Sequence, residues 1–519
     1  MLQWSVENAI QSQPPLRLFD LMMRIKFFVF VLFSVIPCCA SAADAPRPNV
    51  LWICADDLAA YTLGCYGNSQ AHTPNIDRLA AEAVRFDRAY CNSPVCTASR
   101  QSFLTGRYPR TVGVTQLKSA LPESETTLAE MLAAAGYRTA AIGKMHFNGP
   151  LKHGFELRLD IPEYQRALKK RGRQPLPDNV RVQPPWHPFK DPASVWLNSE
   201  CLPVGLTDAD TSGTWFARQA ADYLEKAPAQ PFFLMVSFYE PHSPFVFPVE
   251  YRGRRDPRSL VVPAVGPQDE WQIPAIFRDL TEAQKQGITA AYYASAEFLD
   301  KNVGLVLDAL KANGHDRDTL VVLTGDHGYM LGQHGRFEKH CSYEPAVRAP
   351  LVIRLPGGQH AGHNAALVEF IDIVPTVLDR CRVPVPEAVQ GRSLAALRDG
   401  GAQRHRDRVV VEYSENEEAM IRDDRYKLVY ITGRRQREDG YATSEPLTKR
   451  VIELFDEQND PEELHDLAGQ EEQAGRIEAL LHQLADHLRR TARQPERLPE
   501  TDDLYAFIDA CLAPHDVGH

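Results

Sequence analysis

Short apolar segments, separated by stretches with helical periodicity, dominate residues 43–385. Near-continuous runs of β-branched and aromatic residues are typical of strands buried on both faces of a sheet. The alternation of strands and helices predicts an α/β fold in which a large, mostly parallel or mixed sheet is sandwiched by helices. We expect strands at residues 49–54, 137–143, 231–238, 319–325 and 350–356, and helices at residues 73–84 (N-capped by Thr73, with Pro74 first), 214–227 and 297–314.

The pattern changes after residue 385, where apolar and polar residues alternate. Segments 407–414, 418–424 and 426–432 predict a smaller antiparallel sheet, and residues 471–490 predict a terminal helix. We therefore expect a main domain at 43–385 and a C-terminal subdomain at 386–519. The proline-rich segment 156–215 predicts a functional surface loop inserted into the main domain.

The first 42 residues have the features of an export signal. Arg24 and Lys26 precede an apolar run at 27–37, and Ala40 and Ala42 form a small-residue cleavage site, so translation would start at Met22 or Met23. The apolar run is too short for a transmembrane anchor. A lipoprotein anchor through Cys38 is not expected, because "VIPC" is a poor acylation sequence. We expect a periplasmic or secreted protein.

Charge and cysteine content narrow the classes of partner. The chain carries a net charge of −11, and removal of residues 1–42 takes away three basic and two acidic side chains, which leaves −12. This acidic balance argues against nucleic acid as a partner. Cysteines then remain at 54, 65, 91, 96, 201, 341, 381 and 511, and their disulfide pairing stays open.

Acidic side chains directly follow two of the predicted strands. Asp56 and Asp57 follow the first strand, and Asp326 and His327 follow the strand at 319–325. In open α/β sheets the carboxyl ends of parallel strands line the ligand crevice. Three carboxylates and an imidazole meeting there predict a divalent cation site, in which oxygen ligands favour Ca²⁺ or Mg²⁺ and the histidine admits Mn²⁺.

Two further strands deliver basic side chains to the same edge. Lys144 and His146 follow the strand at 137–143, and His242 follows the strand at 231–238. Each could by itself belong to a turn or to the exposed surface. Their common position, shortly after the end of a strand, predicts one functional site.

Cys96 precedes Arg100 in "PVCTASRQSFLTGRYP", residues 94–109. The thiol could be structural, paired with Cys91, a catalytic thiolate or a modified residue. A hard cation prefers oxygen to sulfur as a ligand. A cation site and this cysteine are therefore compatible if the thiol is replaced by an oxygen nucleophile.

The segment "CTASRQSFLTGR" resembles the signature C-x-P-S-R-x-x-x-L-T-G-R of the type I, formylglycine-dependent sulfatases of the alkaline phosphatase superfamily. The resemblance extends over most of the chain. It includes "TPNIDRLA", "GKMHF", "PHSPF", "LTGDHGYMLGQHG", "RFEKHCSYEPAVRAPLVI", "DIVPTVLD" and "LFDEQNDPEELHDLA".

This resemblance implies a sulfuric ester hydrolase with one cation, Ca²⁺ in most members of the family. A maturing enzyme would oxidise Cys96 to formylglycine, whose hydrate attacks sulfur and is later regenerated as the aldehyde. Arg100 would stabilise the hydrate, His146 would orient it, and His242 would protonate the leaving alcohol. The cation would be held by Asp56, Asp57, Asp326, His327 and the modified Cys96, and the sulfate by Lys144 and Lys339.

Two positions depart from the usual pattern. Ala98 replaces proline, which leaves the identity of the maturing enzyme open. His327 stands where many sulfatases have asparagine and resembles iduronate sulfatases and phosphonate monoester hydrolases, which leaves Mn²⁺ open and makes phosphonate or phosphodiester hydrolysis an alternative. An exported binding protein with an unmodified Cys96 is a second alternative.

A sulfated carbohydrate is the expected substrate, because the protein has the features of an exported one. The segment "GKMHFNGPLKHGFE" resembles choline sulfatases instead, so a small sulfated molecule stays open. Trp186, His187 and Trp196 in the 156–215 segment could contact the substrate or anchor the loop.

Overall fold

A mixed sheet of eight strands forms the centre of the structure, in the order β4-β3-β5-β1-β6-β7-β2-β8. The computed structural model describes residues 47–178, 180, 205–227, 230–358, 361–397, 404–434, 442–443 and 447–514. The strands are β1 (Asn49–Ala55), β2 (Val84–Tyr90), β3 (Arg138–Gly143), β4 (Leu157–Leu159), β5 (Phe232–Phe238), β6 (Thr319–Gly325), β7 (Leu351–Arg354) and β8 (Gly362–Glu369).

All five predicted strands of the main domain are present. Four of them, β3, β5, β1 and β6, are neighbours and run parallel, whereas β7 is antiparallel to β6 and β2. Three strands were missed. In β2 charged residues interrupt the apolar ones, β4 is a three-residue edge strand, and β8 begins with polar residues and has only a short apolar run.

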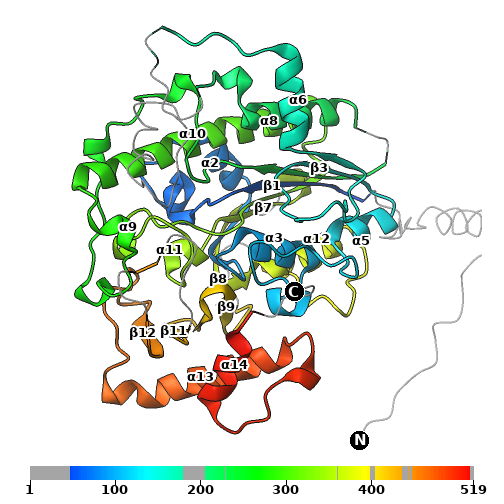
Figure 1. The fold of residues 1–519 in the computed structure, drawn as a ribbon. Helices are drawn as coiled ribbons and strands as arrows, with labels where there is room; N and C mark the ends of the chain where they lie inside the picture. Colours follow the sequence, from blue (N-terminus) through cyan, green and yellow to red (C-terminus); the bar gives the residue numbers. More distant parts are fainter. Residues whose placement is uncertain are drawn as a thin grey trace, which may run out of the picture. The chain divides into compact units, whose positions relative to one another are not determined.

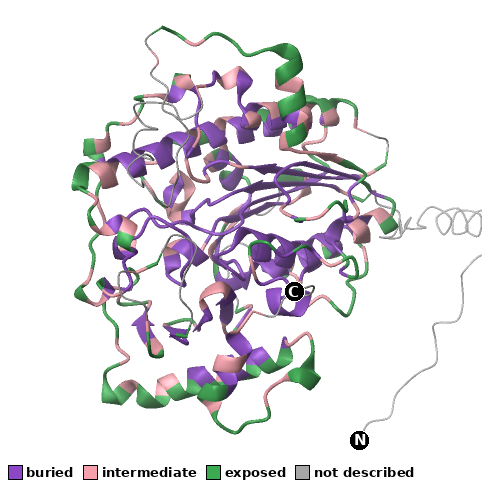
Figure 2. Cartoon of the chain, viewed as in Figure 1, coloured by how far each residue is buried: buried purple, intermediate pink, exposed green. Residues whose placement is uncertain are grey.

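Helices cover both faces of the sheet. Side chains of β1 alternate between the two layers: Trp52 packs on one side, and Leu51 and Ile53 pack on the other. The central strands, such as β1, are accordingly buried between the helical layers (Figure 2). Figure 1 shows α2 (Pro74–Ala81), α8 (Ser212–Glu225) and α10 (Glu282–Ala312) on one face, and α3 (Cys96–Thr105), α5 (Leu128–Ala134) and α12 (Ile373–Arg380) on the other.

The predicted start of the helix at 297–314 is wrong, because α10 begins at Glu282. Thr281 caps it: the Thr281 hydroxyl accepts from the Gln284 N–H at 3.3 Å, and the Gln284 side chain accepts from the Thr281 N–H at 2.9 Å. The first half of α10 is rich in alanine and tyrosine rather than leucine, which hid its periodicity. Thr73 precedes α2 as expected but makes no side-chain cap hydrogen bond.

A second sheet, of four antiparallel strands in the order β12-β11-β10-β9, confirms the smaller C-terminal sheet. One face packs against two helices, α13 and α14, through Leu428, Leu484 and Ile508, and the other face joins the main core through Val411 and Val429. The elements are β9 (Val409–Tyr413), β10 (Glu418–Arg422), β11 (Tyr426–Ile431), β12 (Val451–Asp456), α13 (Ala474–Arg490) and α14 (Leu504–Leu512).

The remaining helices are short, apart from one in the predicted insertion. Its described part forms β4 and a regular helix, α6, rather than a loop throughout. The predicted export signal, Cys38, Cys201, Trp186, His187 and Trp196 lie outside the described residues. The helices are α4 (Pro109–Val112), α6 (Ile161–Arg171), α9 (Ala275–Arg278) and α11 (Glu344–Val347).

Six of the described cysteines, at 54, 65, 91, 96, 341 and 511, are free thiols, and all but the half-buried Cys65 are buried. No disulfide therefore joins these six cysteines to one another. No helix in the described part of the chain has the length and apolar character needed to cross a membrane.

Gly143, the last residue of β3, is required by its surroundings. Its φ is +95°, and a Cβ there would lie 1.9 Å from the Ser237 carbonyl oxygen. That carbonyl accepts a 3.0 Å hydrogen bond from the Lys144 N–H. We expect Gly143→Ala to lower the free energy of unfolding by about 3 kcal/mol, because left-handed backbone strain adds to a steric clash. Denaturant titration measures this loss.

Gly136 offers a matched control for the strain alone. Its φ is +90°, and a Cβ there would have no atom within 4 Å. Gly136→Ala should cost only about 1 kcal/mol. Equal losses for the two variants would show that the close approach at Gly143 has no energetic consequence.

Candidate active site

Three buried carboxylates follow the ends of β1 and β6. The two strands are parallel neighbours in which Ala55 pairs with Gly325, so Asp56 and Asp326 begin at the same level. The Asp326 N–H donates to the Ala55 carbonyl at 3.0 Å, and Asp326 Oδ1 accepts from the Asp57 N–H at 3.0 Å. The sheet register therefore holds the carboxylates together.

Helix α3 begins at Cys96, beside these carboxylates, and is buried along its whole length. Ser99 fixes its first turn by donating from Oγ to the Asp326 carbonyl at 2.5 Å. Arg100 follows one helical turn after Cys96, on the same side of the helix. The free N–H groups at this helix end favour negative charge next to Cys96.

Ala98, which replaces the usual proline of the signature, is the third residue of α3. The first N–H groups of a helix have no partner within the helix, so this position requires neither a hydrogen-bond donor nor its absence. The methyl group of Ala98 packs in a small buried cluster with Val95 and Tyr413. The substitution is therefore compatible with the local structure.

Arg100 is fully buried and connects four elements of the site. Its Nε donates to Asp326 Oδ2 at 2.8 Å, and Nη2 lies 3.5 Å from Asp56 Oδ1. Its Nη1 donates to the Lys144 carbonyl at 2.7 Å and to Ser237 Oγ at 2.8 Å. A guanidinium with these contacts fixes the positions of two carboxylates at once.

Two buried lysines compensate the negative charge. Lys144 follows β3 and forms an ion pair with the Asp56 carboxylate. Lys339, from the segment between β6 and β7, places Nζ 2.6 Å from Asp57 Oδ1 and 2.9 Å from Cys96 Sγ. Both ammonium groups could therefore contact an anion that binds next to Cys96.

Three histidines surround Cys96 at different depths. His327 is buried, and its Nε2 lies 3.2 Å from Cys96 Sγ and 3.6 Å from one oxygen each of Asp57 and Asp326. Its Nδ1 lies 3.0 Å from the Gly328 carbonyl oxygen, which can accept a hydrogen bond only from a protonated Nδ1, and its Nε2 faces the carboxylates. His242 is about a third exposed, with Nε2 4.0 Å from Asp57 Oδ2.

His146 and Asp57 both adopt left-handed backbone conformations, with φ of 61° and 63°. Such values are uncommon outside glycine and occur often at functional sites. His146 is largely buried, and its Nδ1 has no hydrogen-bond partner among the described residues. Burial lowers the pKa of His146, and the interaction with Cys96 opposes this effect.

The charges at the site oppose the effect of burial. Burial by itself would raise the pKa of the Cys96 thiol, but the ammonium groups of Lys144 and Lys339 lower it well below its ordinary value. Burial raises the pKa of Asp326 to about 6, and the His327 and Arg100 charges oppose this rise. Burial lowers the pKa of His327, but the charges of Asp326 and Cys96 outweigh it and raise the value to about 9.

The donor set fits a hard divalent cation. Ligand atoms of Asp56, Cys96, Asp326 and His327 all lie within 4.8 Å of one another, and so do those of Asp56, Asp57, Cys96 and His242. Two buried carboxylate oxygens, Asp56 Oδ1 and Asp57 Oδ2, have no hydrogen-bond partner among the described residues. Buried carboxylate oxygens without a hydrogen bond are costly, and a cation bound to them would offset this cost.

The structure brings all the predicted site residues to one edge of the sheet, and it adds three that the sequence analysis missed. Ser99 and Ser237 hold Asp326 and Arg100, and the Lys144 Nζ lies 5.6 Å from the centre of the Tyr239 ring. The position of Ser237 next to a strand end was a usable signal. Tyr239, the first residue after β5, offered the same signal, whereas Ser99 offered none, because its contact with Asp326 joins segments 227 positions apart.

Comparison with known families yields two matches. Residues 48–383 match the model of the sulfatase family. Residues 332–492 match the model described as N-sulphoglucosamine sulphohydrolase, C-terminal.

Individual relatives cover most of the chain. An arylsulfatase of Clostridium perfringens is 29% identical over 466 residues, which cover 84% of this chain and 93% of the relative. An N-acetylglucosamine-6-O-sulfatase of Bacteroides thetaiotaomicron is 25% identical and covers 85% of this chain and 86% of its own length. The solved phosphonate monoester hydrolase of Agrobacterium radiobacter has a TM-score of 0.72 at 25% identity, with 88% and 98% coverage.

Proposed function

The chain belongs to the sulfatase family and is a sulfuric ester hydrolase, and we propose that it removes sulfate from a carbohydrate through a formylglycine made from Cys96. The observation that carries the proposal is the position of Cys96. Its Sγ lies at the N-terminus of α3, within hydrogen-bond distance of Lys339 and His327 and among carboxylates that fit a cation.

Formylglycine at position 96 would supply a hydrated aldehyde, whose hydroxyl is an oxygen nucleophile. Its second hydroxyl gives an internal route for expelling sulfate, which a serine ester lacks. Arg100 supports this chemistry indirectly, because its bonds to Asp326 and Lys144 fix the groups that surround the nucleophile. We assign it a positioning role and a stabilising charge.

The cation would be held by Asp56, Asp57, Asp326 and His327 together with the oxygen at position 96. A bound divalent ion supplies Lewis acidity, which polarises a sulfate oxygen and favours ionisation of the hydrate. The predominance of carboxylate oxygens favours Ca²⁺, and His327 keeps Mn²⁺ as an alternative.

Lys144 and Lys339 are proposed to bind the sulfate. The Lys144 ammonium group forms an ion pair with Asp56, and the Lys339 ammonium group forms one with Asp57. Preorganised cations in a buried site stabilise the charge that develops on oxygen without reorganisation. The N-terminus of α3 adds a dipole of the same sign.

His242 is the proposed proton donor to the leaving alcohol. It exposes 35% of its side chain, so its ring borders both the buried groups and the solvent, from which a leaving group would be reached. Burial would lower its pKa, but the Asp57 charge leaves the pKa of His242 raised, which favours the protonated donor. His146 is proposed to orient the hydrate, because it interacts with Cys96.

A carbohydrate is the proposed substrate class because the names of two of the matches contain a sulfated sugar or its sulfatase, N-sulphoglucosamine sulphohydrolase and N-acetylglucosamine-6-O-sulfatase. Export is proposed from the sequence of residues 1–42. A maturing enzyme that accepts Ala98 would then act on the chain before or during export.

Phosphonate or phosphodiester hydrolysis is the second candidate, supported by the resemblance to phosphonate monoester hydrolase. We expect kcat/KM for an aryl sulfate to exceed the values for an aryl phosphodiester and an aryl phosphonate with the same leaving group, by about 100-fold or more. Steady-state rates on the three substrates measure this. Faster hydrolysis of the phosphorus esters would reverse the assignment. The carbohydrate class is tested separately, by comparing kcat/KM for a sulfated monosaccharide with kcat/KM for choline sulfate.

A further inference from the structure

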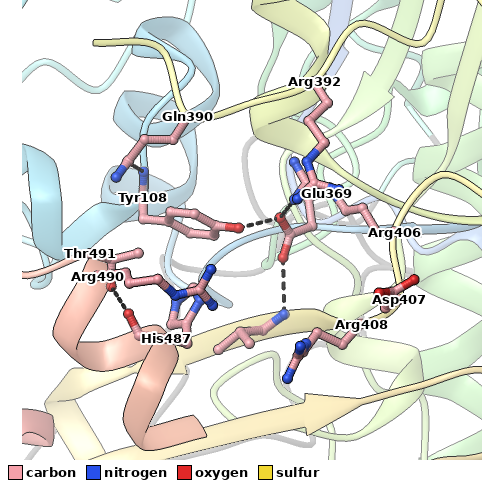
Figure 3. A pocket seen from close by; sticks show the side chains of 11 residues that line it. Tyr108, Glu369, Gln390, Arg392, Arg406, Asp407, Arg408, His487, Arg490 and Thr491 are labelled. Carbon is pink, nitrogen blue, oxygen red and sulfur yellow. Dashed lines mark hydrogen bonds and ion pairs between the residues drawn. The ribbon is translucent and has the colours of Figure 1, made fainter. Parts of the chain in front are cut away.

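A basic pocket lies away from the active site, between the main core and α13. It has a volume of about 290 Å³, and the side chains that line it include Tyr108, Glu369, Arg392, Arg406, Asp407, Arg408, His487 and Arg490 (Figure 3). Tyr108 follows the C-terminal end of α3, whereas Cys96 is its first residue. Ten residues of helix span about 15 Å, so the pocket is a separate feature.

The carboxylates of this pocket already have cationic partners. Glu369 lies 3.1 Å from Arg406 and accepts from the Tyr108 hydroxyl at 2.7 Å. Asp407 pairs with Arg404 at 2.8 Å. These two carboxylates therefore do not neutralise the positive charge of the other arginines that line the pocket.

Three guanidinium groups remain available. Arg392, Arg408 and Arg490 form no ion pair with any carboxylate of the described residues, and the side chains of Arg392 and Arg490 contact only backbone carbonyls, at 3.4 and 3.2 Å. In Figure 3 they approach the pocket from different sides. Arginine clusters of this kind bind oxyanions, because each guanidinium presents donors in a planar fork.

A second pocket extends the basic surface. It has a volume of about 270 Å³ and shares Arg408 and Arg490 with the first, while Arg489 and Asp486 complete its lining. Two adjoining pockets with shared arginines can bind successive anionic groups of one chain. The protein as a whole carries a net charge of −11, so this local positive surface is opposite in sign to the rest of the molecule.

We propose that these two pockets form a secondary binding site for sulfate groups of a glycan chain, distinct from the site that hydrolyses them. The identification of the ligand as a glycan rests on the proposed function, whereas its oxyanion chemistry follows from the arginines. The rings of Tyr108 and His487, with centroids 4.6 Å apart and packed edge to face, line the pocket beside these arginines. A polymeric substrate would thus be held by groups that do not react.

The test uses the full-length protein and low-molecular-weight dextran sulfate, with titration calorimetry as the measurement. In Arg392→Gln/Arg408→Gln/Arg490→Gln we expect the Kd to rise about tenfold, equivalent to roughly 1.4 kcal/mol. Arg406, which is paired with Asp372 and Glu369, is left unchanged so that the fold is preserved. The thermal midpoint and kcat/KM on a small aryl sulfate should stay at their wild-type values.

Arg173→Gln/Arg218→Gln/Arg317→Gln is the matched control, because it removes the same number of charges from exposed arginines that do not line these pockets. It should bind dextran sulfate like the wild type, and uncharged dextran should bind to neither. An unchanged Kd in the triple variant of the pockets, or no wild-type binding, would overturn the proposal. If the wild type binds sodium sulfate but not dextran sulfate, and the triple variant of the pockets binds neither, the ligand of the pockets is free sulfate and not a glycan. If the wild type does not hydrolyse the aryl sulfate, that result would instead count against the proposed function.

Discussion

Cys96→Ser is expected to lower kcat/KM on an aryl sulfate by at least about 10⁴-fold, because serine cannot supply the hydrated aldehyde. A serine sulfate ester has no second hydroxyl through which sulfate can be expelled. The fold should tolerate the change, since Cys96 Sγ contacts polar groups, Lys339 Nζ at 2.9 Å and His327 Nε2 at 3.2 Å, that a hydroxyl can also contact. Steady-state hydrolysis by protein from its native cell provides the measurement.

Cys65→Ser is the matched control, because this thiol is free, half-buried and outside the site. It should leave kcat/KM unchanged. Mass analysis gives an independent readout: the tryptic peptide 89–100 should be about 18 Da lighter than the unmodified sequence, through conversion of the thiol carbon to an aldehyde. An active enzyme in which both Cys91 and Cys96 remain alkylatable would contradict the mechanism.

Most of the site could be predicted because its residues follow the ends of recognisable strands. Asp56 and Asp326 stand directly after continuous apolar runs, and neighbouring parallel strands place such positions at one edge. Lys144 was predicted in the same way, because it directly follows β3. Cys96 and Arg100 required the family signature, since nothing in the polarity of residues 94–109 indicates that their helix is fully buried.

What the sequence could not provide are contacts between distant segments. Ser99 is an ordinary helical residue until the Asp326 carbonyl is placed beside it, 227 positions away along the chain. Strand β2 has no continuous apolar run and is identified only by its partners β7 and β8. The arginines of the basic pocket likewise come from three separate segments, so no local pattern reveals them.

Arg100→Met is expected to have the second largest effect, on both stability and activity. The substitution would leave the Asp326 and Asp56 carboxylates buried without the guanidinium that lies 2.8 and 3.5 Å away. Removal of one partner from a buried ion pair costs about 3–5 kcal/mol. We expect an unfolding free energy lower by that amount and a kcat/KM lower by at least about 100-fold, because the displaced carboxylates no longer position the nucleophile.

Arg110→Met separates the structural part of this effect from the functional one. Arg110 is also buried and donates from Nε to Glu412 at 2.8 Å, but it lies outside the site. It should lose comparable stability in denaturant titration while the folded protein keeps the wild-type kcat/KM. Added Ca²⁺ should raise the thermal midpoint of wild type and Arg110→Met more than that of Arg100→Met, because a ligand stabilises only a native state that binds it. If Arg100→Met kept both full activity and the Ca²⁺ response, the guanidinium would have no role in organising the carboxylates.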